Sequence, residues 1–330
     1  MNLIDKLKQK IEGKHIKVVY PEGSDERIVK AAVRLAQDNL ADPIILGTKE
    51  EVEAILAKHQ MNLPANVEII DPKTYPDNLF DEMLDSFLKR RAGKNTADQG
   101  REWLRNVNNY FGTMLVYMKK ADCMVSGAIN PTGDTVRPAL QLIKTKPSVS
   151  RTSGAFIMTR NDGQETYVFA DCAININPTA QELAEIAVES VKTARLFDID
   201  PKVAMLSFST KGSAKSEEVT KVMEATTLAQ KMAPDEEIDG ELQFDAALIP
   251  SVGESKAPGS KVAGHANVFI FPDLQSGNIG YKIAQRLGNF TAIGPILQGL
   301  NQPVSDLSRG ASEEDAYQVG IITAAQTTME

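Results

Sequence analysis

A chain of 330 residues exceeds the roughly 250–300 residues at which one hydrophobic core stops growing, so we expect two domains. The net charge of −8 and the absence of a basic tract argue against nucleic acid or anionic membranes as partners. No run approaches the ~18 apolar residues of a membrane span, and the N-terminal segment lacks a signal-peptide core, so we expect a cytoplasmic protein.

The first part of the chain alternates strands and helices. Short apolar strands are predicted at 15–20, 44–47 and 67–70, each followed by a turn or a helix cap. Continuous apolar strands separated by helices predict a parallel sheet covered on both faces. Helices are expected next at 77–91 and 96–120. No G-x-G-x-x-G motif follows the first strand, so a nucleotide-binding Rossmann site is not supported.

A loop of small and polar residues follows the buried strand predicted at 122–125. It begins at Ser126 and enters a helix, with Thr132 able to donate from the turn and Arg137 in the first helical turn. Ligands of open α/β sheets lie at the carboxyl ends of the strands. We therefore expect this loop to bind substrate rather than to be a generic turn.

The second half begins near 147, where Lys146-Pro147 indicates a domain boundary. Asn161-Asp162-Gly163 between two apolar runs predicts a hairpin, and Thr179 with Glu182 predicts the start of a long helix. Further elements are expected as strands at 203–208, 242–249, 268–272 and 291–297, and as a helix at 276–287.

Two loops of this half carry polar groups. The serine- and glycine-rich turn 209–216 precedes a helix and could hold a phosphate with its backbone N–H groups. It lacks the G-x-x-x-x-G-K-[ST] pattern, so it is not a nucleoside-triphosphate loop. The segment 252–266 is expected to be a mobile loop, and it contains Lys256 and Lys261.

The stretch 303–315 leads into the last helix. Ser312 and Asp315 form an S-x-x-D capping box, and Ser308 and Arg309 precede it. A guanidinium, a hydroxyl and a carboxylate beside free helix N–H groups suit an anion. The alternative is a solvated arginine and an aspartate that only caps the helix. We expect this helix to pack on the first domain, with 308–315 facing 126–137 in a cleft between the domains.

The cysteines and histidines predict neither a thiol site nor a metal site. Cys123 and Cys172 each follow an aspartate inside an apolar run, which is typical of buried small residues. His15, His59 and His265 are scattered without the spacing of metal ligands, so no metal is expected.

Six segments together resemble the phosphate acetyl/butyryltransferase family, over nearly the whole chain. They read VSGAINPTGDTVRPALQLIKT, YVFADCAININPTAQELAEIA, VAMLSFST, DGELQFDAAL, SKAPGSKVAGHANVFIFPDLQSGNIGYK and IGPILQGLNQPVSDLSRGAS. The resemblance implies an α/β fold like that of isocitrate and isopropylmalate dehydrogenases, with largely parallel sheets and a cleft between two domains. We place these domains at 1–146 plus 298–330 and at 147–297.

The resemblance also implies the chemistry. The expected reaction is acetyl-CoA plus phosphate giving acetyl phosphate and CoA, in a homodimer acting on small molecules. No tightly bound cofactor is implied, and K⁺ or NH₄⁺ is a possible activator. By motif, Ser308, Arg309 and Asp315 are the catalytic set, and Arg137 binds phosphate. We add Thr132, Ser126 and Lys256 as substrate-binding candidates.

One departure from the family pattern lies in the basic turn LKRRAGK at 88–94. Lys89 stands at the place of a phosphate-binding arginine, and a lysine cannot bind phosphate bidentately. Arg90 is therefore the alternative ligand, and a solvated helix end is the third interpretation. Ala311 stands where the family commonly has a cysteine, so an obligatory thiol is not expected.

Asp315 is expected to act as general base, with Ser308 donating to the oxyanion or thiolate, and Arg309 and Arg137 on phosphate. The base role is open, because an ordinary aspartate has a pKa of about 3.9 and a thiol about 8.5. Two other functions also remain open. One is a phosphate butyryl- or propionyltransferase on the same scaffold, and the other is a non-catalytic acetyl-CoA-binding module.

Overall fold

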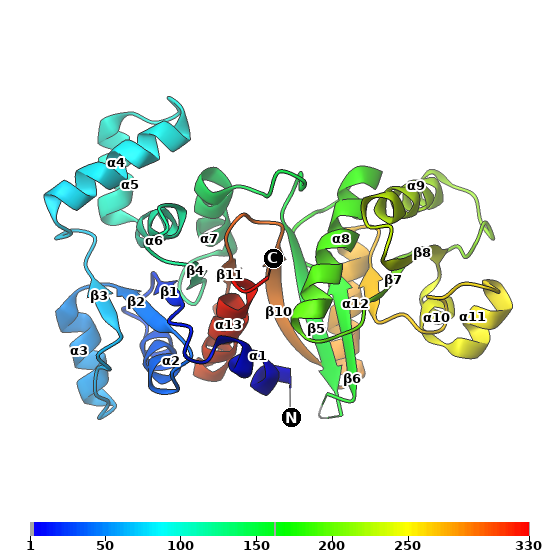
Figure 1. Cartoon of the computed structure of the whole chain (residues 1–330), viewed down its shortest axis with the longest axis horizontal. Coiled ribbons are helices and arrows are strands. Elements are labelled where there is room, and N and C mark those ends of the chain that lie inside the picture. Colours follow the sequence, from blue (N-terminus) through cyan, green and yellow to red (C-terminus); the bar gives the residue numbers. More distant parts are fainter. Residues whose placement is uncertain (1–2, 162, 330) are drawn as a thin grey trace. The chain divides into compact units, whose positions relative to one another are not determined.

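The computed structural model describes residues 3–161 and 163–329. Within them the chain divides into two compact units, one of residues 3–144 and 300–329 and one of residues 145–299 (Figure 1). The expected domain limits at 146/147 and 297/298 stay a prediction. No helix of the described ranges is long and apolar enough to cross a membrane.

The first unit is built on a five-stranded sheet in which every pairing is parallel. The strand order is β11-β4-β1-β2-β3. The strands are β1 (Lys17–Tyr20), β2 (Asp42–Leu46), β3 (Glu68–Ile70), β4 (Cys123–Ser126) and β11 (Val304–Asp306). The central strands are buried on both faces, as the continuous apolar runs predicted.

Helices cover this sheet, and the last helix, α13 (Glu313–Gln326), packs against α2 and α1 of the same unit. The expectation that it packs on the first domain is confirmed. The helix predicted at 96–120 is two helices, because Val107 has an extended backbone with φ −121°. The other elements are α1 (Leu3–Ile11), α2 (Glu26–Gln37), α3 (Lys49–Lys58), α4 (Asp77–Arg91), α5 (Ala97–Asn106), α6 (Asn108–Tyr117), α7 (Thr132–Pro138) and the π-helical turn η1 (Ala139–Ile143).

The second unit has a six-stranded mixed sheet in the order β10-β5-β6-β9-β7-β8. The pairs of β5 with β10 and with β6 are antiparallel, and the others are parallel. The predicted hairpin is confirmed as β5–β6, although Asp162 of its turn lies outside the described residues. The strands are β5 (Ser153–Arg160), β6 (Glu165–Ala170), β7 (Lys202–Leu206), β8 (Glu237–Leu242), β9 (Val268–Ile270) and β10 (Thr291–Gln298). Both sheets together confirm an α/β fold with largely parallel strands.

Two predictions for this unit were wrong. The apolar run 242–249 is mostly a short helix, α10 (Phe244–Leu248), and the strand lies earlier, at β8. The expected mobile loop begins instead with α11 (Pro250–Lys256), since a proline at the first helical position is compatible with a helix. The remaining helices are α8 (Ala180–Leu196), α9 (Glu217–Met232) and α12 (Leu274–Leu287).

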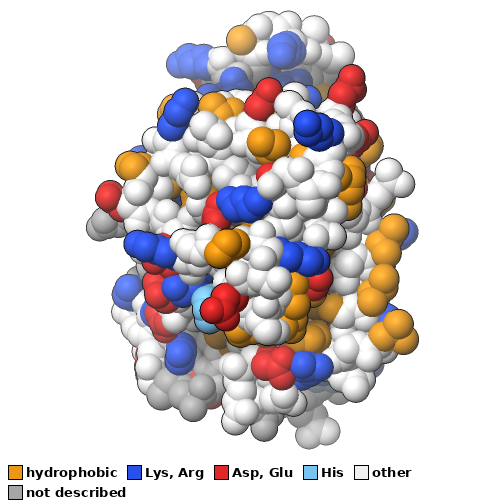
Figure 2. Space-filling view, turned by 90° about the vertical axis from the view of Figure 1, so that its right-hand side faces the viewer, with side chains coloured by type: hydrophobic (Ala, Val, Ile, Leu, Met, Phe, Trp, Pro, Cys, Tyr) orange, Lys and Arg blue, Asp and Glu red, His pale blue; other side chains and the backbone are white. Residues whose placement is uncertain are grey.

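The surface of the second unit carries charges of both signs. Figure 2 views the molecule from the side on which α10 and α11 lie in Figure 1, and basic, acidic and hydrophobic side chains are interspersed there. Several of the charges in this unit are paired, including Lys202 with Glu237 at 2.7 Å. This face therefore has no extended patch of positive charge.

Candidate active site

Parallel pairing of β4 with β11 brings two loops that are distant in the sequence to one edge of the first sheet. Asp306 lies opposite Ser126 in the register, and the Leu307 N–H donates to the Ser126 carbonyl at 2.6 Å. A Cβ atom on Gly127, whose φ is +112°, would lie 2.4 Å from the Leu307 carbonyl oxygen, so only glycine allows this approach. The loops after Ser126 and Asp306 therefore start side by side. Their expected location in a cleft between domains stays a prediction.

The loop after β11 presents the predicted catalytic set. Ser308 and Arg309 are exposed, and the Arg309 guanidinium has no partner among the described residues. The Ser312 capping box is confirmed: Asp315 Oδ2 accepts from the Ser312 N–H and hydroxyl, each at 2.8 Å, and the Asp315 N–H donates to Ser312 Oγ at 3.1 Å. Asp315 is thus an exposed helix cap, and its Oδ1 is left for another contact.

The loop after β4 leads to Arg137 at the end of α7. The Arg137 side chain is 62% exposed, and its nearest acidic atom, Asp134 Oδ1, is 3.8 Å from Nη1. It is therefore available to an anion. Ser126 differs, because its buried hydroxyl donates to Asn109 Oδ1 at 3.2 Å. Contacts of Ser126 and of Thr132, the first residue of α7, with substrate stay predictions.

Two of the three basic residues in the last turn of α4, Lys89 and Arg90, have different environments. The Arg90 guanidinium donates to the carbonyls of Leu142 and Ile143, at 2.5 Å and 2.9 Å, and stacks over Tyr117. These contacts hold the end of η1, which continues from α7. Lys89 is exposed. Whether either residue contacts phosphate stays a prediction.

Lys256 belongs to the second unit and is engaged there. Its Nζ donates to Asp245 Oδ2 at 2.9 Å and to Gln243 Oε1 at 3.0 Å. The hydrogen bond from Lys256 lowers the pKa of Asp245. Its role in substrate binding stays a prediction.

The interpretation of the turn 209–216 as a phosphate cradle was wrong. The Gly212 N–H and the Ser209 hydroxyl both donate to the buried Glu241 Oε1, at 2.7 Å and 2.9 Å. The Thr210 and Ala214 N–H groups donate to serine hydroxyls of the same turn. Because these donors are already satisfied within the protein, they are not available to an anion.

Sequence reasoning missed Arg27 on α2, which connects both loops of the site. Its Nη1 donates to the carbonyls of Arg309 and Ala311, at 3.0 Å and 2.7 Å, and Nη2 donates to the Ala128 carbonyl at 2.9 Å. Burial acts to raise the pKa of the Asp25 carboxyl, but the bonds and charge of Arg27 outweigh it and lower that pKa overall. Nothing local in the sequence indicates partners so distant.

Asp306 was also missed as a group of interest. Its side chain is 4% exposed, and neither its Oδ1 nor Oγ1 of the buried Thr135 has a hydrogen-bond partner within the described chain. Burial is the main cause that raises the pKa of the Asp306 carboxyl, and Glu22 adds to the rise. The nearby hydroxyls of Thr132 and Thr135 lower it in part, although Thr135 Oγ1 lacks the geometry of a hydrogen bond to this carboxyl. A buried carboxyl with an unsatisfied oxygen therefore lies directly before the Ser308–Arg309 turn.

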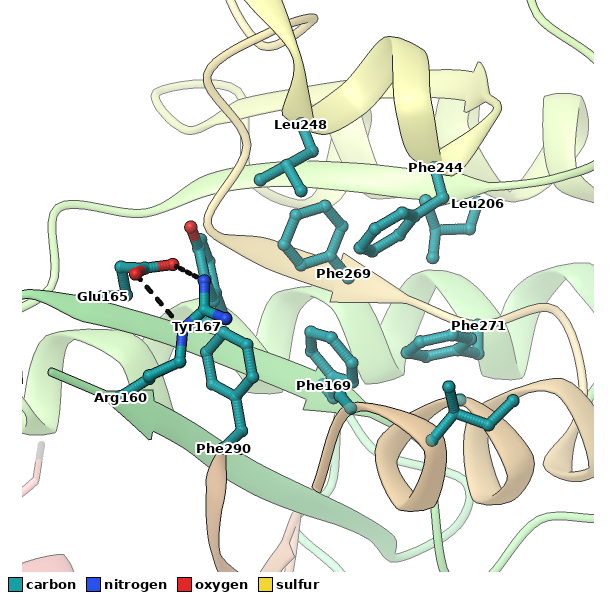
Figure 3. A pocket seen from close by; sticks show the side chains of 13 residues that line it. Arg160, Glu165, Tyr167, Phe169, Leu206, Phe244, Leu248, Phe269, Phe271 and Phe290 are labelled. Carbon is teal, nitrogen blue, oxygen red and sulfur yellow. Dashed lines mark hydrogen bonds and ion pairs between the residues drawn. The ribbon is translucent and has the colours of Figure 1, made fainter. Parts of the chain in front are cut away.

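The second unit contains an aromatic cavity of about 430 Å³ (Figure 3). Phe169, Phe269 and Phe290 are among the rings that line it, and the ion pair of Arg160 with Glu165 lies at one side. Such an apolar lining suits hydrocarbon groups and offers little to a phosphate.

Both cysteines are buried, as predicted, and burial raises the pKa of each thiol, with Asp122 and Asp171 adding to the effect. Such thiols are poor nucleophiles. Within the ranges that the structure describes, no three His, Cys, Asp or Glu side chains are grouped so that they could hold a metal ion.

Known proteins are similar to this chain over its whole length. A phosphate acetyltransferase from Staphylococcus epidermidis is 59% identical over 330 residues, and the match covers 98% of each chain. The crystal structure of a phosphotransacetylase from Streptococcus pyogenes has a TM-score of 0.96 and 61% identity, covering 99% of this chain and 98% of the other. A branched-chain phosphotransacylase from Enterococcus faecalis shares the fold, with a TM-score of 0.66 and 18% identity over 96% of this chain and 100% of its own. The model of the phosphate acetyl/butaryl transferase family matches residues 2–324, and the chain belongs to this family.

Proposed function

We propose that the chain catalyses the reversible reaction of acetyl-CoA with phosphate to give acetyl phosphate and CoA. The observation that carries this proposal is the pairing of β4 with β11. The segment after β4 leads to Arg137 of α7, and the segment after β11 contains Ser308 and Arg309 and leads to Asp315 in the first turn of α13. Two exposed guanidinium groups beside a hydroxyl and a helix N-terminus suit a phosphate dianion. The relatives at nearly 60% identity, named phosphate acetyltransferases, support the same reaction.

The required chemistry is attack of the CoA thiolate on the acetyl carbonyl of acetyl phosphate. The new C–S bond forms as the C–O bond to phosphate breaks, and phosphate leaves with its electron pair. With a thiol pKa of about 8.5, roughly 3% of CoA is thiolate at pH 7, so full deprotonation contributes only about 2 kcal/mol. Preorganised donors for the developing charge usually contribute more, so we assign Arg309 and Arg137 the larger effect.

We assign Ser308 as donor to the oxyanion or thiolate, and Asp315 as acceptor of the thiol proton. Asp315 Oδ2 is already bound by two donors of Ser312, so a proton would arrive at Oδ1. Five further residues remain proposed substrate contacts: Thr132, Ser126, Lys89, Arg90 and Lys256. Of the two in the basic turn, Lys89 is exposed and Arg90 is half-buried.

One assay distinguishes the proposed acetyl transfer from two other functions. Purified chain is mixed with CoA and acetyl, propionyl or butyryl phosphate, and the ultraviolet absorbance of the thioester is followed. We expect acetyl phosphate to give the highest kcat/KM. A preference for butyryl phosphate would make the chain a butyryltransferase, and binding of acetyl-CoA without turnover of any substrate would make it a non-catalytic binding module.

We propose a homodimer that uses the outer face of α12. Ile279, Ile283 and Leu287 are spaced four residues apart on this helix, and Leu287 is 81% exposed. Ile283 also lines the aromatic cavity, so an apolar surface extends from the helix into a pocket. Leu287→Lys should shift the mass in light scattering from dimer to monomer, whereas Met223→Lys, at an exposed site on α9, should not. A monomeric wild type would contradict this proposal.

The remaining proposals concern the cellular compartment and the pathway of the enzyme. The buried free thiols of Cys123 and Cys172 fit a reducing compartment, and we propose the cytoplasm and a role in acetate metabolism.

We also propose that K⁺ or NH₄⁺ activates the enzyme. To test this activation, turnover is measured in KCl, in NH₄Cl and in tetramethylammonium chloride at equal ionic strength. Equal rates in all three salts would contradict activation by K⁺ or NH₄⁺.

A further inference from the structure

Glu22 is a buried acidic residue in the loop between β1 and α2, with a side chain only 4% exposed. Its carboxylate accepts hydrogen bonds from four successive backbone N–H groups of the other loop. Oε2 accepts from Gly127 at 3.0 Å and Ala128 at 2.8 Å, and Oε1 accepts from Ile129 and Asn130, each at 2.9 Å. The Asn130 side-chain amide donates to Oε1 as well, at 3.0 Å.

A run of N–H groups that converges on one point is a common binding site for anions such as phosphate. In this chain the protein's own carboxylate already occupies that point. The N–H groups of 127–130 are therefore not available to the substrate, and the negative charge of Glu22 would repel an anion placed beside them. The loop consequently contributes to the site through its shape rather than through its N–H groups.

The shape of this loop determines where α7 begins, because only Pro131 separates it from Thr132, the first residue of the helix. The loop is also held from its carbonyl side, since Arg27 donates to the Ala128 carbonyl and to the carbonyls of Arg309 and Ala311. One buried anion and one partly buried cation thus fix the same short loop from opposite sides. Through Arg27 the loop is tied to the turn that contains Arg309.

We propose that Glu22 is a positioning residue for acyl transfer. By fixing the 127–130 backbone, it sets where Arg137 of α7 meets the phosphate group, and it does not touch the substrate itself. This inference rests on the proposed function of the site. Loss of a residue with a purely structural role would lower stability alone. Loss of a positioning residue also lowers kcat/KM at temperatures where the protein is fully folded.

The chain offers a closely matched control in Asp171 of the second unit. Its carboxylate also accepts from four backbone N–H groups, those of Gly154, Ala173, Ile174 and Asn175, and from the Asn175 side-chain amide. Asp171 is 2% exposed. Glu22→Gln and Asp171→Asn therefore remove the same charge from two equally buried sites with the same number of donors.

We expect Glu22→Gln to lower kcat/KM for acetyl phosphate by about 10- to 100-fold, the scale of a misplaced binding group, when assayed well below its melting temperature. Asp171→Asn should lose thermal stability to a similar degree and keep kcat/KM within about twofold of wild type. Equal kinetics of the two variants, whether both normal or both reduced, would overturn the proposal.

A rescue experiment tests the same proposal. Glu22→Ala removes the carboxylate and leaves a void in its place, which a small added molecule can fill. Formate should restore the kcat/KM of Glu22→Ala in a saturable way, because its carboxylate can occupy the four N–H groups. Formamide, a neutral molecule of similar size, should not. Equal effects of the two additives would overturn the proposal, and if the alanine variant does not fold, the comparison of Glu22→Gln with Asp171→Asn decides alone.

Amide hydrogen exchange of residues 127–130, measured without substrate, separates this inference from the proposed function. Faster exchange in Glu22→Gln together with reduced kcat/KM supports both. Unchanged exchange and unchanged kinetics overturn the role of Glu22. Faster exchange in a protein whose wild type transfers no acyl group overturns the proposed function, although Glu22 would still hold the loop.

Discussion

Asp315 is either only a helix cap or also the general base of the reaction. The substitutions Ser312→Ala and Asp315→Asn distinguish these two roles. Ser312→Ala removes the hydroxyl that accepts from the Asp315 N–H at 3.1 Å and donates to Oδ2 at 2.8 Å. Loss of such a cap costs about 0.5–2 kcal/mol. Asp315→Asn keeps an oxygen that can accept from Ser312 and loses a charge at the helix N-terminus, for about 0.3–1 kcal/mol. Against a typical stability of about 5–15 kcal/mol, both variants should stay folded.

If Asp315 accepts the thiol proton, the kinetics of these two variants separate. Asp315→Asn should lower kcat by about 10²–10⁴, the range of general-base catalysis, and Ser312→Ala should keep its turnover. The deficit of Asp315→Asn should shrink as the pH rises towards about 8.5, because more CoA arrives already ionised. Initial rates of thioester formation from about pH 6 to about pH 9, with urea unfolding of each variant as the folding control, measure this.

Two results would refute the reasoning. Wild-type turnover in Asp315→Asn would leave the aspartate as a helix cap only. A deficit in kcat that stays constant across the pH range would exclude a simple base and leave Asp315 as a residue that positions the Ser308–Arg309 turn.

The other predictions concern the arginines, the basic turn, the thiols and the buried carboxyl. Arg309→Ala and Arg137→Ala should each lower kcat/KM for acetyl phosphate by at least about 100-fold, since each removes charge-assisted donors from a dianion, and near-normal kinetics would remove that arginine from the site. Arg90→Ala should raise the KM for phosphate more than Lys89→Ala, because Arg90 holds the end of η1. An unchanged KM in both variants would exclude the turn from the phosphate site. Cys123→Ala combined with Cys172→Ala should retain turnover, and an inactive but folded double variant would contradict this. Burial raises the pKa of Asp306 above its ordinary 3.8, so its contribution to stability is present below that pH and lost as the pH rises through the raised value. Asp306→Asn, which cannot ionise, should therefore lose less stability than wild type between about pH 4 and about pH 8, and parallel urea midpoints would argue against it.

Local signals in the sequence predicted local structure well. The capping boxes of Thr179 with Glu182 and of Ser312 with Asp315 are both present, because each depends on residues three positions apart. The buried parallel strands were recognisable from their continuous apolar runs. The strands β8 and β11 were missed, since EIDGEL and VSD are short and polar and form strands only because a neighbouring strand pairs with them.

The arrangement of the site was less accessible to sequence reasoning. The position of Ser308 and Arg309 followed from a short motif, but the residues that hold their loop did not. Glu22 meets its partners more than 100 positions along the chain, and Arg27 meets the Arg309 carbonyl 282 positions away. The turn 209–216 shows the converse error. Its composition is typical of an anion-binding loop, and only the fold shows that the Glu241 carboxylate already accepts a hydrogen bond from its Gly212 N–H.

The first unit is interrupted in sequence by the second, and this affects synthesis of the chain. Residues 145–299 form one continuous stretch, so this unit can fold while the ribosome is still at work, whereas the first unit must wait for 300–329. Until then β4 is an unpaired edge of its sheet, and the surface that α13 covers on α2 is bare. Exposed edges and apolar helix faces invite aggregation. We therefore expect the nascent chain to be most prone to aggregation before residues 300–329 have been synthesised, and no chain that ends before residue 300 contains Ser308, Arg309 or Asp315.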